Sequence, residues 1–464
     1  DIYAPIRPGT DIAYLRAIVK YIIDNKQYDE TYLRDHTNAF YKVNPEFNFH
    51  DGLFSGFDGD RTYNKDTWTY QLDENGDPIV ADSLTDPDTV FTGMPVDKMK
   101  LVAETFVSRR PGTILYALGM TQKTVGTQGI RMYAIIQLLL GNMGMPGGGI
   151  NANRGEPNVQ GTTDLACLPT TLPGYISIPT DKEPTLNDYI MRHGVGAGKK
   201  LISILKAWYG DNATPENEFG YHNIPKRDSK LPGANYVPIF EKLHEDQFKM
   251  GIIFGQNPAV STPSLKMALE GLRKLDFLVV SELFETETSS FWLYPEFDPK
   301  EIKTEVILLP AAFTFDKDGT MTNSSRCIQG KTALVDAPGE AKPDADIIYE
   351  IMLKVKELYA GSKEKKDQGI LDLQWDYPVK GHGIDMEAVL KEMNGYNLKT
   401  GKLLSSGADV TNAVPGTVSS GVAGLYSGVF TEEGNNSLRR DNTDETGLGV
   451  HPNWTFSWPN NSRV

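Results

Sequence analysis

Residues 141–161, GNMGMPGGGINANRGEPNVQG, form the segment with the richest potential binding chemistry. Seven glycines and two prolines in these 21 residues argue against a regular helix or a central strand. Glycine at this density indicates that the backbone passes close to another chain segment or to a cofactor, and a loose linker is the alternative. The run also contains many hydrogen-bonding side chains, namely Asn142, Asn151, Asn153, Arg154, Asn158 and Gln160.

Two short apolar runs lead into glycine-containing turns. Residues 113–118 (TILYAL) precede the turn GMTQ at 119–122, and residues 250–254 (MGIIF) precede the turn GQNP at 255–258. A helical pattern follows each turn, and a later apolar run leads into SELFETET, which begins at Ser281. This order of strand, turn, helix and strand predicts right-handed βαβ units in a mostly parallel sheet. Because ligands bind at the carboxyl ends of parallel strands, we expect the three segments to line one crevice.

Other segments must position these turns. Residues 11–42 carry apolar side chains at helical spacing, which predicts helices. Residues 51–88 are rich in Asp, Gly, Asn and Thr and predict a long surface loop. Residues 170–247 have the character of an insertion with turns, scattered prolines and one helix. The weak pattern of residues 361–464 predicts irregular structure with short strands. The predicted fold class is α/β, from the βαβ order, with residues 361–464 as a covering segment.

Composition bounds the class of protein. The length of 464 residues corresponds to roughly three domains. A formal net charge of −15 disfavours nucleic acid and anionic membrane as partners of the whole surface. The two cysteines, Cys167 and Cys327, exclude a disulfide scaffold and a four-cysteine iron–sulfur site within this chain. The chain opens at Asp1 without a signal sequence and ends on WPNNSRV, so we expect an internal piece of a longer polypeptide.

Several catalytic motifs can be excluded. Residues 194–200 (GVGAGKK) lack the first glycine and the final Ser or Thr of a P-loop. No GxGxxG follows a strand, and GxSxG and HExxH are absent. His382 lies near Asp385 and Glu387, but an exposed loop is the favoured interpretation, and we assign no metal ligand in this chain.

Taken together, the motifs resemble those of the catalytic subunit of respiratory and periplasmic formate dehydrogenases, which belong to the molybdopterin oxidoreductase (DMSO reductase) family. The resemblance runs nearly end to end. It includes DIYAPIRPGTD, YALGMTQKTVGTQGIR, LLGNMGMPGGG to RGEPNVQG, GQNPAVS, SELFETETSSFW, GTMTN to Arg326, RRDNTDETGLG and WPNNSR. TETSSFW and RRDN are similar to the formate enzymes in particular.

The resemblance implies an architecture. Residues 1–156 would be the second half of one doubly wound α/β domain that binds a pterin dinucleotide. Residues 157–345, with the insertion at about 170–247, would be a second such domain. Residues 346–464 would join and cover the two. An N-terminal [4Fe–4S] domain, a selenocysteine or cysteine metal ligand and a C-terminal β-barrel would lie outside this chain, and the fragment alone is expected to be inactive.

The same resemblance implies the cofactor and partners. The cofactor would be bis-molybdopterin guanine dinucleotide with tungsten or molybdenum. Electrons would pass through a [4Fe–4S] cluster to a ferredoxin-like iron–sulfur subunit, with formate and CO2 as substrate and product. Nucleic acid and a direct membrane span are not expected, and the location would be periplasmic.

Arg154 matches the arginine that positions formate in this family. Formate oxidation yields CO2, a proton and two electrons, and a planar guanidinium can hold a carboxylate with two hydrogen bonds. The alternative is that Arg154 pairs with a pterin phosphate or a structural carboxylate. Glu156 stands where relatives often carry Gln or His, and an ionised carboxylate there would repel formate.

The resemblance also implies a set of cofactor-binding residues. Backbone amides at the first two turns can bind pyrophosphate or guanine, and a carboxylate suits the N–H donors of guanine or ribose hydroxyls. The set is Gly119, Met120, Thr121, Gln122, Gly155, Gly255, Gln256, Asn257, Pro258, Ser281, Glu282, Thr286 and Asn323. For each residue the alternative is a turn residue that fixes its own loop, and the roles of Arg439 and Arg440 stay open.

Three other functions remain open at this point. The first is another enzyme of the same family, such as a nitrate or polysulfide reductase with a different anion at Arg154. The second is a non-catalytic module that only binds cofactor or docks a subunit. The third is a nucleotide-sugar-binding enzyme, which would explain the turns but not the glycine run at 141–161.

Overall fold

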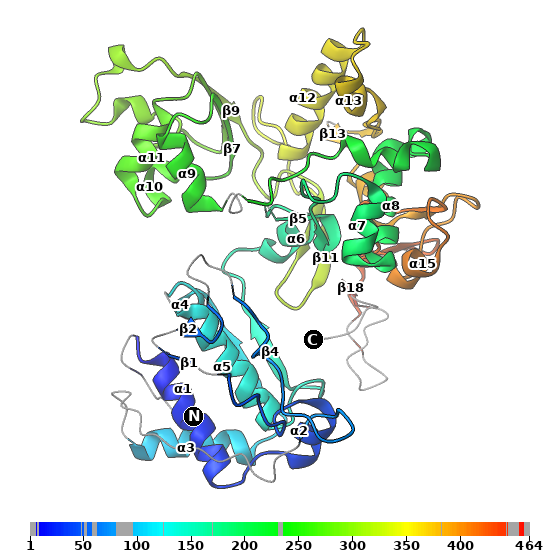
Figure 1. The fold of residues 1–464 in the computed structure, drawn as a ribbon. Coiled ribbons are helices and arrows are strands. Elements are labelled where there is room, and N and C mark those ends of the chain that lie inside the picture. The colour runs from blue at the N-terminus through cyan, green and yellow to red at the C-terminus, as the bar shows by residue number, and fades with distance from the viewer. Residues whose placement is uncertain are drawn as a thin grey trace. The chain divides into compact units, whose positions relative to one another are not determined.

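The computed structural model divides the chain into two compact units, Asp1–Gly155 and Glu156–Arg463, which are described separately (Figure 1). It describes residues 6, 9–47, 49–50, 53–57, 63–79, 96–123, 125–168, 170–230, 235–381, 383–441, 443 and 454–458. His382, most of DIYAPIRPGTD, and much of RRDNTDETGLG and WPNNSR lie outside the described residues. Within the described chain, no helix has the length and apolar character required to cross a lipid bilayer.

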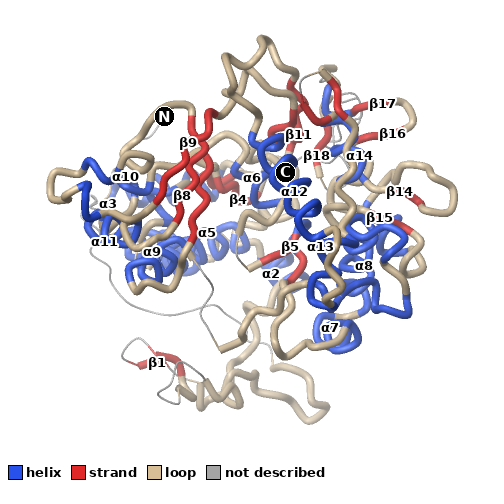
Figure 2. The backbone as a smooth tube through the Cα atoms, turned by 90° about the horizontal axis from the view of Figure 1, so that it is seen from above, coloured by secondary structure: helices blue, strands red, loops and turns tan. Residues whose placement is uncertain are grey.

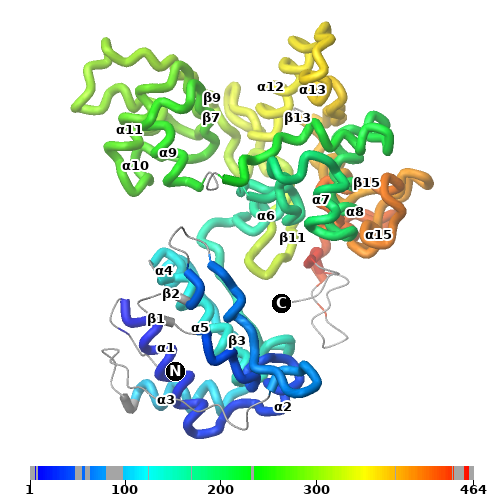
Figure 3. Tube along the Cα trace, in the orientation of Figure 1, coloured from blue at the N-terminus to red at the C-terminus, as the bar shows by residue number. Residues whose placement is uncertain are grey.

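The first unit packs helices around a short parallel sheet. Its elements are α1 (Asp11–Asp24), α2 (Glu30–His36), β1 (Phe49–His50), β2 (Leu53–Phe54), α3 (Val96–Ser108), β3 (Thr113–Tyr116), α4 (Leu118–Thr121), α5 (Gly126–Leu139) and β4 (Gly149–Ala152). β3 and β4 pair in parallel, with Thr113 opposite Gly149 and Tyr116 opposite Ala152. Figure 3 shows β3 beside α5, whose buried Ile136 packs against Leu15 of α1 in a common core.

The second unit contains a three-stranded parallel sheet flanked by helices. Its strands are β7 (Met250–Phe254), β8 (Phe277–Glu282) and β9 (Glu305–Pro310), and its helices are α9 (Tyr236–His244), α10 (Pro258–Ser261) and α11 (Leu265–Leu272). The buried Leu278 and Val280 of β8 pack against Leu272 of α11 and Leu243 of α9. The predicted strand, turn, helix and strand at residues 250–280 are therefore confirmed, and the α/β class with them.

The rest of the second unit is built from helices and short strands around three further hydrophobic clusters among the described residues. Its helices are α6 (Val159–Asp164), α7 (Leu186–His193), α8 (Val195–Tyr209), α12 (Asp344–Tyr359), α13 (Gln368–Asp372), α14 (Met386–Asn394) and α15 (Gly407–Asn412). Its strands are β5 (Thr171–Leu172), β6 (Ile176–Ser177), β10 (Gly319–Thr322), β11 (Cys327–Lys331), β12 (Val379–Lys380), β13 (Gly383–Ile384), β14 (Tyr396–Asn397), β15 (Val418–Ser419), β16 (Phe430–Thr431), β17 (Gly434–Asn435) and β18 (Phe456–Ser457). Short 3₁₀ helices are η1 (Pro173–Tyr175), η2 (Gly210–Asn212), η3 (Pro215–Asn223), η4 (Phe291–Leu293), η5 (Pro299–Glu301), η6 (Lys365–Asp367) and η7 (Asn436–Leu438).

The glycine run at 141–161 contains strand β4 near its middle, at Gly149–Ala152, which pairs with β3 in a two-stranded sheet and is therefore not a central strand. The sequence prediction for the insertion at 170–247 is wrong. The segment 170–247 contains α7, α8 and α9 rather than one helix. The one predicted helix, at about residues 201–208, corresponds to α8, and the sequence analysis missed α7 and α9. Gly198 packs closely inside α8, where a Cβ would lie 2.4 Å from Ile190 Cγ1.

Candidate functional site

In the first unit, the turns after β3 and β4 lie side by side at the carboxyl edge of the sheet. The amide of Asn153, just after β4, donates to the carbonyl of Tyr116 at the end of β3 (2.7 Å). A Cβ placed on Gly155 would lie 3.7 Å from Leu118 Cδ1, so the two turns touch. Arg154 stands between these contacts with an exposed side chain. The structure thus brings Arg154 and Gly155 to the GMTQ turn.

Glycines of α5 allow the GMTQ turn to pack closely. A Cβ on Gly126 would lie 2.5 Å from the carbonyl oxygen of Thr121, and one on Gly129 would lie 2.1 Å from Met120 Cε. Met120 is accordingly buried against α5. The outer side of the turn is open, because a Cβ on Gly119 would meet nothing within 4 Å. Gly119 is therefore where a ligand can approach the backbone.

Most backbone amides of the GMTQ turn are already used. The amides of Met120 and Thr121 donate to the carbonyl of Ala117 (3.0 and 3.3 Å), and that of Gln122 donates to Leu118 (2.9 Å). These bonds close the single helical turn of α4. Of the four backbone amides that we expected to contact a ligand, only that of Gly119 lies outside this set of donors. The amides of Met120, Thr121 and Gln122 are therefore not available to a ligand.

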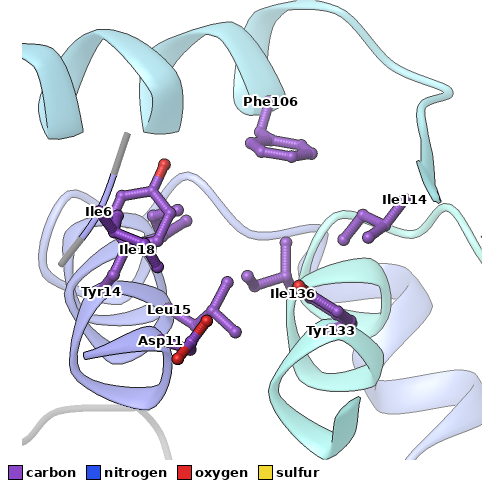
Figure 4. Close-up of a pocket in the computed structure, with 9 residues that line it drawn as sticks. All are labelled: Ile6, Asp11, Tyr14, Leu15, Ile18, Phe106, Ile114, Tyr133 and Ile136. Carbon is purple, nitrogen blue, oxygen red and sulfur yellow. The ribbon is translucent and has the colours of Figure 1, made fainter. Parts of the chain in front are cut away.

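An acidic side chain that the sequence analysis did not select faces the same end of the unit. Asp11, at the start of α1, forms an ion pair with Lys123 at 2.5 Å (Oδ1 to Nζ). Its second oxygen, Oδ2, is buried and has no hydrogen-bond partner among the described residues. Asp11 borders an apolar cavity of about 210 Å³ between α1, α3 and α5, with Tyr14 and Tyr133 on its wall (Figure 4). Burial, together with Asp11, raises the pKa of Tyr133.

In the second unit, the turn after β7 is tied to the loop that follows β8. The side-chain oxygen of Asn257 accepts hydrogen bonds from the amide and the hydroxyl of Thr288 (3.2 and 2.8 Å). Its side-chain nitrogen donates to Glu287 Oε2 (2.6 Å), and this bond holds the pKa of Glu287 below its ordinary value. The amide of Ala259, in α10, donates to the Thr288 hydroxyl (3.0 Å). Asn257 thus ties the turn after β7 to the loop that follows β8.

Two hydroxyl oxygens near this turn are buried and have no hydrogen-bond partner among the described residues. Ser281, at the end of β8, has 0% exposure, and neither its Oγ nor Thr286 Oγ1 has a hydrogen-bond partner in the described part of the chain. A buried hydroxyl left in this state costs about 1–3 kcal/mol. Glu282 is partly engaged, since its carboxylate accepts from the amide of Leu283 (2.9 Å). Ser281 and Thr286 are therefore prepared to contact something beyond these residues.

The remaining predicted residues lie in different surroundings. The amide of Gly255 donates to the carbonyl of Ser281 (3.0 Å), and Gln256 is exposed beside it. Asn323 lies on the β10–β11 hairpin, where its side-chain oxygen accepts from the amides of Ser325 (2.9 Å) and Cys327 (3.1 Å). Asn323 therefore fixes its own turn, as the alternative interpretation held. GMTQ follows a strand of one sheet, whereas GQNP and SELFETET follow strands of another. That the three segments line one crevice stays a prediction.

A buried carboxylate fixes the segment that follows the glycine run. Asp164, at the end of α6, has 0% exposure. Its two oxygens accept hydrogen bonds from four side chains, which are Gln160 (3.0 Å), Tyr175 (2.7 Å), Tyr426 (2.7 Å) and Trp458 (3.0 Å). At the other end of α6, Asn158 accepts from the amide of Thr322 (2.9 Å). Asp164 is a structural centre that the sequence analysis did not select.

Comparison with known proteins identifies the family of this chain. A family profile described as molybdopterin oxidoreductase matches residues 1–354. The chain belongs to the molybdopterin oxidoreductase family. Among solved structures, acetylene hydratase from Pelobacter acetylenicus matches 76% of the chain at 17% identity, with a TM-score of 0.41, which is too loose a likeness to add to this assignment.

Curated relatives cover the whole chain. It is 38% identical to the nitrate-inducible formate dehydrogenase major subunit of Escherichia coli strain K12, covering 100% of this chain and 50% of that protein. It is 38% identical to the formate dehydrogenase major subunit of Haemophilus influenzae, and 37% identical to the formate dehydrogenase 2 subunit alpha (cytochrome c-553) of Nitratidesulfovibrio vulgaris. All of this chain matches in both cases, against 49% and 50% of those proteins, so it spans about half the length of these relatives.

The described residues fit a molybdopterin on two observations. Three buried acceptor oxygens have no partner among them, namely Asp11 Oδ2, Ser281 Oγ and Thr286 Oγ1, and a pterin offers N–H groups that can donate. Gly119 and Gly255 both have open space where a Cβ would stand, so a flat ligand can approach the backbone there. Members of the molybdopterin oxidoreductase family bind such a cofactor with molybdenum or tungsten.

Asp11 was missed because its sequence signal is ambiguous. An acidic residue in the first turn of a helix, after Gly9 and Thr10, is ordinarily explained by the helix dipole. Asp164 carried no motif of its own, and Thr288 lies in TETSSFW but was not selected as a site residue. The Asp11-Lys123 ion pair is visible only once α1 and the turn before α5 are placed together.

Proposed function

We propose that this chain is part of the catalytic subunit of a formate dehydrogenase, which oxidises formate to CO2, a proton and two electrons in a reversible reaction. The observation that carries this proposal is the exposed guanidinium of Arg154 beside the GMTQ turn, in a chain that matches formate dehydrogenase major subunits along its whole length. Nitrate and polysulfide reduction remain the alternatives within the family.

Arg154 binds the substrate. A guanidinium donates two parallel hydrogen bonds to the two oxygens of a carboxylate and so fixes both the position and the direction of a one-carbon acid. Held in this way, formate directs its C–H bond away from Arg154. Because Arg154 follows β4 directly and its neighbour Gly155 touches Leu118, the carboxylate is held at the open side of the GMTQ turn. The positive charge also attracts an anionic substrate to a chain with a net charge of −15.

The cofactor would be bis-molybdopterin guanine dinucleotide with molybdenum or tungsten, and when bound it supplies the centre that accepts two electrons. In the first unit, Gly119, Gln122, Gly155 and Asp11 would hold one dinucleotide. In the second unit, Asn257, Ser281, Glu282 and Thr286 would hold the other. The unpartnered oxygens of Asp11, Ser281 and Thr286 support these assignments, because each accepts a hydrogen bond from an N–H or O–H of the ligand.

The remaining parts of the proposal concern the whole protein. Electrons would leave through a [4Fe–4S] cluster in the portion of the subunit outside this chain and pass to a ferredoxin-like iron–sulfur subunit. A selenocysteine or cysteine from that portion would bind the metal. The periplasm is the proposed location, and these points rest on the resemblance to respiratory and periplasmic formate dehydrogenases.

The full-length assembled enzyme provides the test. Elemental analysis for molybdenum and tungsten, pterin oxidation fluorescence and formate-dependent reduction of a viologen dye would be measured on one preparation. We expect about one metal and about two pterins per catalytic subunit, with turnover of formate but not of nitrate or polysulfide. A folded preparation without pterin would refute the cofactor assignment. Pterin with nitrate turnover and no formate turnover would refute the substrate alone.

A further inference from the structure

An arm of the first unit carries aromatic side chains that its core does not use. The arm is defined by the described residues 41–47, 55–57 and 63–79. Figure 2 shows β1, which belongs to the same stretch of chain, standing clear of α3 and α5. Backbone hydrogen bonds hold the arm in one conformation. The amide of Lys42 donates to Ile79 (2.7 Å), that of Gln71 donates to Lys42 (2.7 Å) and that of Asn44 donates to Thr69 (2.9 Å).

The aromatic rings of the arm pack on one another. Tyr41 pairs with Tyr70 at 5.3 Å between ring centroids, and Tyr63 lies 5.2 Å from Phe57 and 5.3 Å from Trp68. None of these five rings belongs to the buried core of the unit as described. Tyr41, Phe57 and Trp68 are 37%, 39% and 37% exposed. Exposed aromatic residues held in a fixed arrangement are typical of the energetic centre of protein–protein interfaces.

Charge selects the kind of partner. Besides two basic residues, Lys42 and Lys65, the arm carries five exposed acidic residues, which are Glu46, Asp66, Asp73, Glu74 and Asp77. Asp73 Oδ1 accepts from the amides of Asn75 (2.9 Å) and Asp77 (3.0 Å), so the acidic turn has a fixed shape. A second copy of this chain, with its net charge of −15, would be repelled. A face rich in Lys and Arg would be attracted.

We propose that the arm is a docking surface for a second protein chain with a basic face. The Lys and Arg side chains of that face pair with the carboxylates of the arm, and their charged ends lie over its rings. Cations over rings already occur in this unit, where Lys65 Nζ lies 5.5 Å from the centroid of Trp68 and Arg34 Cζ lies 4.0 Å from that of Phe40. This proposal does not depend on formate being the substrate.

Carbodiimide cross-linking of the assembled, full-length enzyme tests the proposal directly. The reagent joins carboxylates to lysines that touch them, and mass spectrometry identifies the linked peptides. We expect Asp66, Glu74 and Asp77 to be linked to lysines of a different polypeptide. Links from the arm only to lysines of its own polypeptide would overturn the proposal, and so would an enzyme that purifies as one polypeptide with these carboxylates unlinked.

Two double variants that reverse charges test how strongly the carboxylates of the arm stabilise subunit association. The double variant Asp66→Lys and Glu74→Lys changes two exposed side chains of the arm, whereas Glu241→Lys and Glu301→Lys makes the same change on two exposed residues of the second unit. We expect the arm variant to weaken subunit association by about tenfold or more at low salt, and the control to leave it unchanged. Native mass spectrometry at a series of salt concentrations measures the dissociation of the subunits. Equal effects of the two variants, with unaltered melting temperatures, would overturn the proposal.

Discussion

The turns after β3 and β7 both follow a strand of a parallel sheet, and they are fixed in different ways. In the second unit, side-chain hydrogen bonds from Asn257 tie the turn after β7 to the loop at Thr288. In the first unit, glycines of α5 let the turn after β3 pack closely, and Arg154 is left exposed beside it. The turn fixed by side chains lies near buried hydroxyls that have no hydrogen-bond partner among the described residues, such as Ser281 Oγ. A turn fixed by backbone packing keeps its outer side available for a small substrate.

The largest expected effect is on catalysis in the first unit. Arg154→Lys keeps the charge but replaces a planar fork by a single ammonium, so formate loses its bidentate partner. We expect kcat/KM for formate to fall by about 10²- to 10³-fold, which is the loss that misplacement of a substrate causes. Initial rates of dye reduction by the assembled enzyme, measured over a range of formate concentrations, give this ratio.

Arg131→Lys is the matched control for Arg154, because Arg131 is an exposed arginine on α5 of the same unit. It is expected to change kcat/KM by less than about twofold. If Arg154→Lys behaved like this control, the alternative interpretation, in which Arg154 serves a phosphate or a structural carboxylate, would replace substrate positioning.

The second prediction concerns how far the local stability of each turn depends on side-chain hydrogen bonds. Asn257→Ala removes the acceptor of two hydrogen bonds from Thr288 and the donor to Glu287. We expect the local opening free energy of the β7–β8 region to fall by about 2–3 kcal/mol. Hydrogen–deuterium exchange of the β7 and β8 amides measures this fall. The corresponding change in the first unit, Gln122→Ala, removes an exposed side chain and should alter exchange at β3 by less than about 0.5 kcal/mol.

A third prediction compares one glycine from each turn. Gly255 has φ +58°, a left-handed conformation, whereas Gly119 lies within the helical turn α4. Both have open space at the Cβ position. Gly255→Ala is therefore expected to cost about 1–2 kcal/mol of backbone strain, while Gly119→Ala should leave the melting temperature unchanged or raise it slightly.

The pterin content of the Gly119→Ala variant tests whether a ligand lies against the backbone at Gly119. If a dinucleotide lies against the backbone at Gly119, the added methyl group of Gly119→Ala lowers the pterin content of an enzyme whose stability is normal. Full pterin content in this variant would remove Gly119 from the proposed contacts, and a lower melting temperature would show that the open space seen there is filled in the folded enzyme.

The sequence analysis succeeded where local signals decide structure. The apolar run before Gly255 and the helical pattern after it predicted β7 and α11, because strand and helix periodicities differ within a few residues. It failed where partners are distant in the chain. Tyr426 and Trp458 lie 262 and 294 residues from Asp164, and only the fold brings them to its carboxylate. Strand β4 was missed because its place beside β3 overrides the low strand propensity of a glycine-rich segment.

The smallest expected effect is a pH dependence of stability that arises from Glu287, beside the turn after β7. Asn257 holds the pKa of Glu287 below the ordinary value of 4.5. A carboxyl group with a lowered pKa in the folded state contributes stability above its unfolded pKa, and this contribution disappears as the pH falls through the folded pKa. Wild type should therefore melt slightly above Glu287→Gln at pH 7, and the difference should vanish at low pH, as the pH falls through the lowered pKa of Glu287. In the Asn257→Ala background the same substitution should have no effect at either pH, because the hydrogen bond that lowers the pKa is gone. A difference between the two proteins that persists at low pH, or that survives in that background, would mean that Glu287 acts through another contact and that Asn257 does not organise this turn.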